Sequence, residues 1–276
     1  MLEKALGLAP DVFVPDMEDS VPWSEKRSGR EITASFLPRL AVTGRPVVPR
    51  LNSLDTGLFE EDLAAVIGPH IFGVTVGKVQ SGEDMERATR LIDRYETNAG
   101  LPAGRIRLIP WLETAKAVVN AYEICKSSPR TVAVAFGAED FTNDMGIERR
   151  PDETDVAYPR SVVAVAARAA GVPALDTPYF GFRDPQGLRE SSLRSKRFGY
   201  HGRFAIHPSQ IEIINETYAP SEAEVENAVR VVAAFEEAER QGRGTTSLDG
   251  QVIDVPVVRR ARKLLEAAGR SSPTSS

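Results

Sequence analysis

The chain has 276 residues, 42% hydrophobic and 26% charged, with a formal net charge of −5. This is the composition of a globular protein large enough for a substantial core, and its acidic balance argues against a nucleic-acid-binding protein, which usually carries a basic excess. The single cysteine, Cys125, excludes an internal disulfide, and no secretory leader or apolar run of roughly 20 residues is visible, so we expect a cytoplasmic protein that does not cross a membrane.

Seven short apolar segments are predicted as strands because they are near-continuous apolar runs, which is typical of strands buried on both faces. In chain order they are DVFVP (11–15), PVVPRL (46–51), IFGVTVGK (71–78), IRLIPWL (106–112), TVAVAF (131–136), GVPALDT (171–177) and RFAIH (203–207). Longer segments with helical spacing lie between them, such as GEDMERATRLIDRYE, TAKAVVNAYEICK and VAYPRSVVAVAARAAG. Strand and helix in alternation predict right-handed crossovers and a parallel sheet.

The spacing of these strands favours a TIM-type (β/α) barrel over an open nucleotide-binding sheet. Consecutive strands start roughly 25–40 residues apart, as in such barrels. No G-x-G-x-x-G turn follows any of them, so the open dinucleotide-binding sheet loses its best support. Seven strands are one fewer than a closed barrel of this type needs.

The pattern changes after residue 218. Residues 221–240 predict a long amphipathic helix with Ser221 as N-cap and Glu224 three positions on, 242–256 predict a hairpin with its turn at LDGQ, and Pro256 begins a last helix. We therefore expect a barrel domain over 1–218, an arm over 219–270 that packs on the barrel or on a neighbouring subunit, and a disordered tail over 271–276.

Carboxylates follow two consecutive predicted strands. Glu113 ends one strand and Asp140 the next, and the carboxyl ends of barrel strands meet at one mouth. Two hard anionic ligands without a His or Cys cluster nearby suit Mg²⁺ rather than zinc. The alternative is that each carboxylate caps the helix that follows its strand, and the pattern alone leaves both interpretations open.

Two further side chains stand at strand ends. Arg50 directly follows a buried run, where an arginine either pairs with nearby acids or binds a substrate carboxylate or carbonyl. His207 precedes a proline and a predicted helix start, and a hydrogen-bonded structural histidine is the favoured interpretation.

Several stretches together resemble one known family. They are DMEDSVPWSEKR, PRLNSLDTGLFEEDL, GKVQSGED, IPWLETAKAVVNAYEI, FGAEDFTNDMG, YPRSVVAVAARAAGVPALDTPYFGFRDPQGL, GRFAIHPSQIEIIN and GRGTTSLDGQVIDVPVVRRARKLL. In this order they resemble the citrate lyase β-subunit-like family of the HpcH/HpaI aldolase superfamily over nearly the whole chain. GAEDF together with GQVIDVP is most similar to citramalyl-CoA and malyl-CoA lyases.

The resemblance implies a metal-dependent homo-oligomer, a trimer or hexamer, that breaks or makes a carbon–carbon bond next to a CoA thioester, giving acetyl-CoA and a 2-oxo acid. It implies that Glu113 and Asp140 hold Mg²⁺, or Mn²⁺ in its place, and that Arg50 contacts the substrate. Asp254 is the implied acid/base, reaching a neighbouring subunit's mouth.

Further residues are expected around this implied site. Glu18, Asp19 and Lys78 stand near the metal, and the backbone N–H groups at Gly137 and Ala138 bind the oxo-acid carboxylate. Members of the family usually begin with a strand that precedes the equivalent of MLEKALGL and helps to bind CoA, so we expect this chain to lack the first strand.

Two other functions stay open at the level of sequence. One is an aldolase acting on free 2-oxo acids, which would want a His/Arg pair in the barrel and would not need Asp254. The other is a catalytically weak partner subunit that binds acyl carriers or other chains, made plausible by the missing strand.

Overall fold

Six parallel strands form one sheet in the computed structural model, which describes residues 2–270. Each strand pairs with the next in chain order. The strands are β1 (Arg50–Leu51), β2 (Gly73–Val76), β3 (Arg107–Leu112), β4 (Val134–Phe136), β5 (Ala174–Asp176) and β6 (Gly202–Arg203). The prediction of an α/β fold with a parallel sheet is confirmed.

The first predicted strand, 11–15, contributes less pairing than expected. It makes two isolated parallel bridges, Phe13 with Val47 and Asp16 with Arg50, and so extends the sheet beyond β1. Within residues 2–270, no backbone pairing joins this segment to β6. Closure of the barrel therefore stays a prediction.

The sheet curves strongly. Neighbouring strands lie about 4.8 Å apart, so β3 and β6 would be about 14 Å apart in a flat sheet. Instead the ring of Trp111 on β3 contacts the ring of Phe204, which follows β6, with 4.3 Å between the ring centroids. Ile109, Trp111 and Ala135 belong to one buried apolar cluster inside this curve. The concave side of the sheet is thus a packed core, as in the predicted fold.

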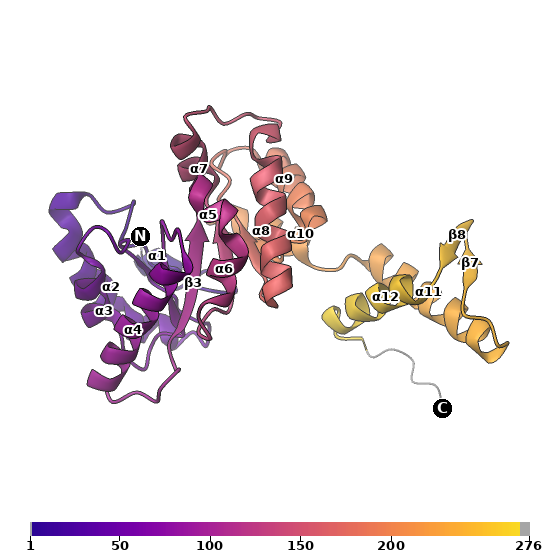
Figure 1. Cartoon of the computed structure of the whole chain (residues 1–276), viewed down its shortest axis with the longest axis horizontal. Helices are drawn as coiled ribbons and strands as arrows, with labels where there is room; N and C mark the ends of the chain where they lie inside the picture. The colour runs from indigo at the N-terminus through magenta and orange to yellow at the C-terminus, as the bar shows by residue number, and fades with distance from the viewer. Residues whose placement is uncertain (1, 271–276) are drawn as a thin grey trace. The chain divides into compact units, whose positions relative to one another are not determined.

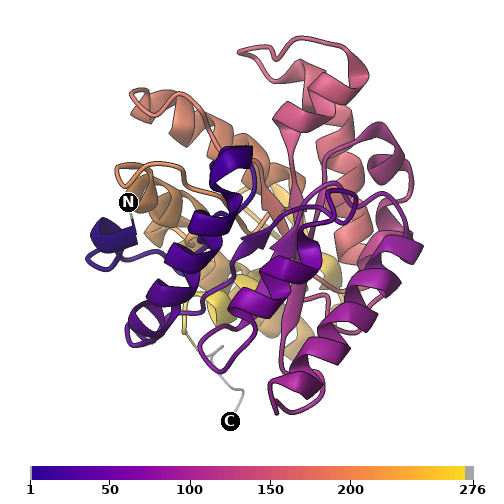
Figure 2. The ribbon, with the colours of Figure 1, turned by 90° about the vertical axis from the view of Figure 1, so that its left-hand side faces the viewer.

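Helices cover the convex side of the sheet (Figures 1 and 2). Each of the larger ones packs against the next in the order α2, α3, α4, α6, α8 and α9. In chain order the helices of this part are α1 (Leu2–Ala5), α2 (Lys26–Ala41), α3 (Phe59–Val66), α4 (Gly82–Asn98), α5 (Ala115–Val119), α6 (Ala121–Lys126), α7 (Ala138–Met145), α8 (Ala157–Ala170), α9 (Pro185–Phe198) and α10 (Gln210–Tyr218). Ser81, Thr114 and Asp184 cap α4, α5 and α9 with their side chains.

One predicted helix is divided. The segment 114–126 forms α5 and α6, which meet at Asn120. The side-chain amide of Asn120 donates to the carbonyl of Gln80, 2.9 Å away in the loop before α4. The break is accompanied by a contact between residues 40 positions apart in the sequence, and local periodicity does not reveal such a contact.

Cys125, on α6, is buried, and burial raises its pKa to about 12.

The chain divides into two compact units, Met1–Ile214 and Asn215–Ser276. The second unit contains α11 (Glu222–Arg240), the hairpin of β7 (Thr246–Leu248) and β8 (Gln251–Ile253), and α12 (Val255–Ala267). Ser221 and Glu224 form the predicted capping box, and Asp249 and Gly250 turn the hairpin with positive φ. Val232, Phe235, Ile253 and Leu265 are among the side chains that pack together in its core. The predicted tail, 271–276, lies outside the described residues.

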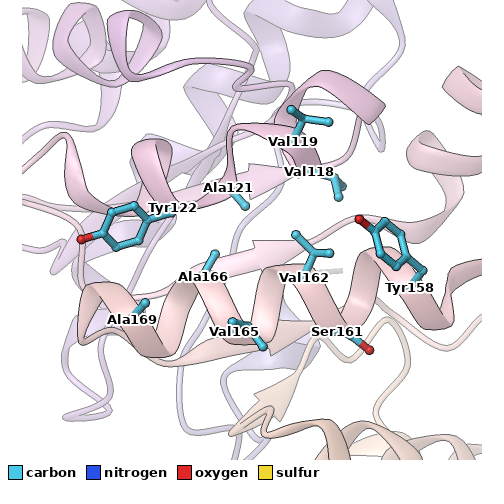
Figure 3. A pocket seen from close by; sticks show the side chains of 10 residues that line it. All are labelled: Val118, Val119, Ala121, Tyr122, Tyr158, Ser161, Val162, Val165, Ala166 and Ala169. Atoms are coloured by element: carbon cyan, nitrogen blue, oxygen red, sulfur yellow. The ribbon is translucent and has the colours of Figure 1, made fainter.

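The outer helical layer of the first unit carries an apolar groove of about 380 Å³ (Figure 3). Its walls come from α5 and α6 on one side and from α8 on the other. The lining residues are Val118, Val119, Ala121, Tyr122, Tyr158, Ser161, Val162, Val165, Ala166 and Ala169. Val119, Tyr158 and Val165 are each at least 70% exposed, which is unusual for large apolar side chains grouped together.

Over residues 2–270, no helix is both long and apolar enough to span a membrane.

Candidate active site

The acidic site is laid out by the alternation of side chains along the strands. Ile109 and Trp111 point into the core, and two residues further along the same face stands Glu113, just past the end of β3. Val48 and Arg50 are related in the same way beside β1, as are Ala135 and Gly137 beside β4. At the carboxyl edge of the sheet, the apolar residues of the core are therefore followed by Arg50, Glu113 and Gly137.

Glu113 is the most deeply buried acid of the site, with 2% of its surface exposed. Its Oε1 accepts a hydrogen bond from the backbone N–H of Lys78 at 2.6 Å. Lys78 has a φ of +55°, a conformation that L-residues seldom adopt and that strained functional sites often contain. Burial raises the pKa of Glu113 to about 8, and the nearby charges of Asp140 and Glu18 add to the effect.

Two glycines make the space that Glu113 occupies. A Cβ on Gly77 would lie 2.7 Å from Glu113 Oε1, and a Cβ on Gly137 would lie 2.5 Å from Glu113 Oε2. Both distances are far below van der Waals contact, so any side chain at either position would displace the carboxylate. Neither glycine has a positive φ, and close approach rather than backbone freedom explains both.

Asp140 stands in the first turn of α7, directly after β4. Burial raises its pKa, and the positive charges of Lys78 and Arg50 only partly offset that effect. Because the charge of Asp140 also contributes to the raised pKa of Glu113, the two carboxylates are close enough to repel each other. The predicted convergence of these two strand ends is thus present in the structure.

A second group of charges lies beside this pair. Arg50 donates to both carboxylate oxygens of Asp16, from Nε at 2.8 Å and from Nη2 at 2.6 Å, and its Nη1 lies 3.2 Å from Glu18 Oε2. Lys78 Nζ lies 3.2 Å from Glu18 Oε1 and 3.7 Å from Asp19 Oδ1. The expected neighbours Glu18, Asp19 and Lys78 do come together with Arg50.

Glu18 is buried and incompletely satisfied. Its Oε2 has no hydrogen-bond partner in the structure, although it lies within ion-pair distance of Arg50. Burial raises the pKa of Glu18, while the pKa of Asp16 is lowered because the hydrogen bonds and charge of Arg50 outweigh its burial. The pKa is thus raised for three carboxylates of this site, the buried Glu18 and Glu113 and the half-buried Asp140, because burial outweighs the nearby positive charges.

This donor set fits a hard divalent cation. Across residues 2–270, no three His, Cys, Asp or Glu side chains are arranged as a complete metal-binding group. Mg²⁺ is usually held by one or two carboxylates, with waters and substrate oxygens completing its shell, and Glu113 with Asp140 meets that requirement. A bound cation would also relieve the mutual repulsion that raises the pKa of both. The alternative of simple capping does not hold for Glu113, because Thr114 is the N-cap of α5.

The structure corrects the role predicted for two backbone N–H groups. Gly137 N donates to the carbonyl of Leu112, and Ala138 N donates to the hydroxyl of Thr177 at 3.2 Å. Both donors are engaged within the protein, so they do not offer a free binding site for a substrate carboxylate. Gly137 instead gives Glu113 room.

Asp254 belongs to the second unit. It is the N-cap of α12, and its Oδ1 accepts from the backbone N–H of Val257 at 3.1 Å. Its expected place at a neighbouring subunit's mouth stays a prediction.

Three residues of the site were missed at the level of sequence. Asp16, Gly77 and Thr177 were given no role, although Asp16 is the main partner of Arg50. Thr177 directly follows β5 in the stretch LDTP, and its hydroxyl at a strand end is the one sequence signal that could have indicated a role in the site.

A separate cleft of about 290 Å³ lies between the loops that follow β5 and β6. Gln210 joins the two loops, donating to the carbonyl of Tyr179 and accepting from the N–H of Ile206. Phe182 lines the cleft, with the ring of His207 at 5.3 Å between centroids and the guanidinium of Arg183 at 5.3 Å from its ring. His207 thus contacts Phe182, and also Ser209, rather than the acidic group.

Comparison with known proteins places the chain in a family. Residues 1–208 match the model of the HpcH/HpaI aldolase/citrate lyase family. The citrate lyase subunit beta of Leuconostoc mesenteroides subsp. cremoris is 36% identical over 268 residues, which is 97% of this chain and 89% of that protein. A (3S)-malyl-CoA thioesterase of Cereibacter sphaeroides is 34% identical over 267 residues, covering 97% and 90% of the two chains.

Solved structures agree with the fold. The protein CitE from Mycobacterium tuberculosis, in complex with magnesium, acetoacetate and coenzyme A, is 29% identical with a TM-score of 0.76, over 94% of this chain and 90% of that one. A citrate lyase from Burkholderia xenovorans LB400 superposes with a TM-score of 0.83 over 99% and 88% of the two chains at 22% identity, which bears on the fold alone. The resemblance found in the sequence is therefore confirmed, and the chain belongs to the HpcH/HpaI aldolase/citrate lyase family.

Proposed function

We propose that this protein is a Mg²⁺-dependent carbon–carbon lyase that cleaves a 3-hydroxyacyl-CoA of the citramalyl-CoA or malyl-CoA type into acetyl-CoA and a 2-oxo acid, or catalyses the reverse condensation. The observation that carries the proposal is the pair of a buried Glu113 and a half-buried Asp140 at neighbouring strand ends, with raised pKa values and two glycines making room for Glu113.

Glu113 and Asp140 would hold Mg²⁺, with Mn²⁺ as a substitute. When bound, such a cation supplies Lewis acidity to a substrate hydroxyl and oxo group, a contribution of several kcal/mol in enzymes of this kind. The metal that accompanies CitE from Mycobacterium tuberculosis, together with coenzyme A, supports this assignment.

Arg50 would offset negative charge on the reacting oxygens. Its guanidinium has five N–H donors; Asp16 accepts from two of them and Asp19 from a third, which orients the group and leaves two donors for a substrate. The face of Trp111 lies 5.4 Å from the guanidinium carbon and restricts its movement further. Glu18, Asp19 and Lys78 would surround the metal and set the local charge.

Asp254 would move the proton. In cleavage, the hydroxyl loses its proton to solvent and becomes the oxo group of the product as the bond between the acyl α-carbon and the carbinol carbon breaks. The thioester enolate left behind takes a proton from Asp254, which solvent then protonates again. In condensation, the Asp254 carboxylate removes that proton from acetyl-CoA. This step requires the second unit to reach the mouth of a barrel, as the family resemblance implies.

The cleft after β5 and β6 supports a CoA substrate. It opens at the same edge of the sheet as the acidic site, and its volume is near the lower limit for small-molecule sites, enough for part of a long ligand. An exposed aromatic ring and a guanidinium at Phe182 and Arg183 suit stacking and phosphate contacts.

A homo-oligomer, trimer or hexamer, is part of the proposal. The apolar groove between α5, α6 and α8 supports it, because exposed apolar patches of this kind mark interaction surfaces (Figure 3).

The test is release of 2-oxo acid from (S)-citramalyl-CoA and malyl-CoA, with Mg²⁺ and with a chelator, in the wild type and in Asp254→Asn. Asparagine caps helices as well as aspartate does, so the variant keeps the cap of α12 and loses only the acid. We expect Mg²⁺-dependent release that the substitution abolishes.

The same assay separates a second function. The relatedness to a (3S)-malyl-CoA thioesterase favours hydrolysis of the thioester as the alternative. Free thiol would then appear without 2-oxo acid. Metal-dependent thermal stabilisation without either product would instead favour a partner subunit, and cleavage of free hydroxy acids without CoA would favour an aldolase.

A further inference from the structure

The first turn of α7 has no side-chain cap from its own N-cap residue. This helix begins at Ala138, and its N-cap position is Gly137, which has no side chain to accept from the exposed N–H groups of the helix. A serine, threonine or aspartate would be the ordinary solution. It is excluded here because a Cβ at residue 137 would lie 2.5 Å from Glu113 Oε2. Because the carboxylate of Glu113 needs this space, residue 137 must be glycine, and α7, which carries Asp140, has no side-chain cap at its N-cap position.

The missing cap is supplied from the neighbouring strand. The hydroxyl of Thr177, directly after β5, accepts the hydrogen bond from Ala138 N, and both residues are almost completely buried. Three other strands of the sheet are followed by a helix whose cap comes from its own loop, at Ser81, Thr114 and Asp184. At α7 the accepting group lies 39 residues further along the chain.

Thr177 is itself held by a buried guanidinium. Arg203 on β6 donates to the carbonyl of Thr177 from Nε at 3.1 Å and from Nη2 at 3.0 Å. Its Nη1 donates to the hydroxyls of Ser191 and Ser192 on α9, each at 3.0 Å. The side chain of Arg203 is fully buried, so these bonds are not shared with solvent.

We propose that Thr177 is a positioning residue that caps α7 from the neighbouring strand, and so holds Asp140 beside Glu113 as a preformed pair of metal ligands. The inference rests on the proposed metal site. The two carboxylates repel each other before the cation arrives, and a movement of α7 that carries Asp140 away from Glu113 would relieve that repulsion. The hydrogen bond from Ala138 to Thr177, backed by Arg203, opposes that movement.

The experiment measures Mn²⁺ affinity of the full-length chain by titration, followed by electron paramagnetic resonance, in Thr177→Val and Thr177→Ser. Valine keeps the shape and removes the acceptor, whereas serine keeps the hydroxyl. We expect Thr177→Val to weaken binding about 10-fold, the lower end of what supporting residues contribute to metal sites, and Thr177→Ser to stay within about 2-fold of wild type. Thermal melting verifies folding, and Thr177→Ala serves if the valine variant does not fold.

Thr142→Val is the matched control. Thr142 is buried on the same helix, but its hydroxyl donates only to the carbonyls of Ala138 and Glu139 within α7, 3.0 Å away. We expect it to leave Mn²⁺ affinity unchanged. Equal weakening in the control and in Thr177→Val, or no weakening in Thr177→Val, would overturn the inference.

Failure of the inference and failure of the proposed function are distinguishable. If the wild type binds Mn²⁺, and Glu113→Gln abolishes that binding while Thr177→Val does not alter it, the metal site stands and the positioning role falls. If the wild type does not bind Mn²⁺ at all, both fall together.

Discussion

Two clusters of charge lie beside the same sheet, one at the ends of β1 to β4 and the other near β5 and β6, and they differ in balance. At the ends of β1 to β4, Glu18, Glu113 and Asp140 have raised pKa values, and one oxygen of Glu18 has no hydrogen-bond partner. Beyond β5, Glu153 accepts from two nitrogens of Arg160, from Ser191 and from Arg194, and burial notwithstanding, these groups lower its pKa to about 2.

The difference separates a binding site from a structural network. In the cluster around Glu153, each acid is paired with an arginine, although Oδ1 of Asp155 also has no hydrogen-bond partner. The cluster around Glu113 has an excess of buried negative charge that the chain does not neutralise. Unneutralised charge that shifts the pKa values of several buried groups is typical of functional sites. Substitutions of matched type in the two clusters should therefore have opposite consequences.

The largest expected effect is on stability, in the balanced cluster. Glu153→Gln leaves Arg160 and Arg194 without their shared carboxylate, and loss of one partner from a buried ion pair costs about 3–5 kcal/mol. The free energy of unfolding in urea measures it. Mn²⁺ affinity of the folded variant should fall far less than in Glu113→Gln, because Glu153 reaches Thr177 only through Ser191 and Arg203. An equal fall in affinity would contradict the division between the two clusters.

The pH dependence of that stability follows from the same carboxylate. Its pKa is about 2 in the folded chain against an ordinary value of 4.5, so its charged form stabilises the fold above pH 4.5 and the contribution is lost as the pH falls toward 2. The shift corresponds to at most about 3 kcal/mol. The difference in unfolding free energy between wild type and Glu153→Gln, measured at pH 7, 4 and 3, should shrink as the pH falls. A constant difference would show that packing, not charge, accounts for it.

Glu113→Gln should have the opposite pattern in the unbalanced cluster. Glutamine keeps the acceptor for Lys78 N and removes a charge that burial disfavours, so the metal-free variant should unfold at no lower temperature than wild type. Loss of a direct ligand should weaken Mn²⁺ binding by more than about 100-fold, beyond the effect of supporting residues. A variant that loses stability and keeps its metal affinity would make Glu113 a structural acid.

Sequence reasoning located the unbalanced cluster and missed the balanced one for a physical reason. Glu113 and Asp140 directly follow strands, and parallel strands bring their carboxyl ends together, so chain position was enough to pair them. Arg160, on a helix, and Glu153, in a loop, meet Asp176 and Arg203 only because the helices wrap a curved sheet. Nothing in the local pattern of AYPRS or PDETD marks such contacts.

The supporting residues of the site were hidden for a different reason. The role of Gly137 depends on where the side chain of Glu113 lies, 24 positions earlier, and the role of Asp16 depends on the register between its segment and β1. The N–H groups at residues 137 and 138 were expected to bind a substrate carboxylate, and both are engaged within the protein. Their partners, Leu112 and Thr177, were invisible because they lie on neighbouring strands.

The smallest of these effects comes from the space around the Glu113 side chain rather than from its charge. Alanine substitutions at two glycines test it. Gly137→Ala would put a Cβ 2.7 Å from the Cβ of Glu113, whereas Gly202→Ala, on β6, would meet nothing nearer than 3.7 Å. Neither glycine has a positive φ, so the comparison isolates close contact from backbone strain. We expect Gly137→Ala to lower the unfolding free energy by about 1–3 kcal/mol, as overpacking does, and to weaken Mn²⁺ binding because Glu113 must move. Gly202→Ala should change neither. If both variants behave like wild type in urea unfolding and Mn²⁺ titration, the carboxylate is not confined by its glycines, and the site is looser than its packing implies.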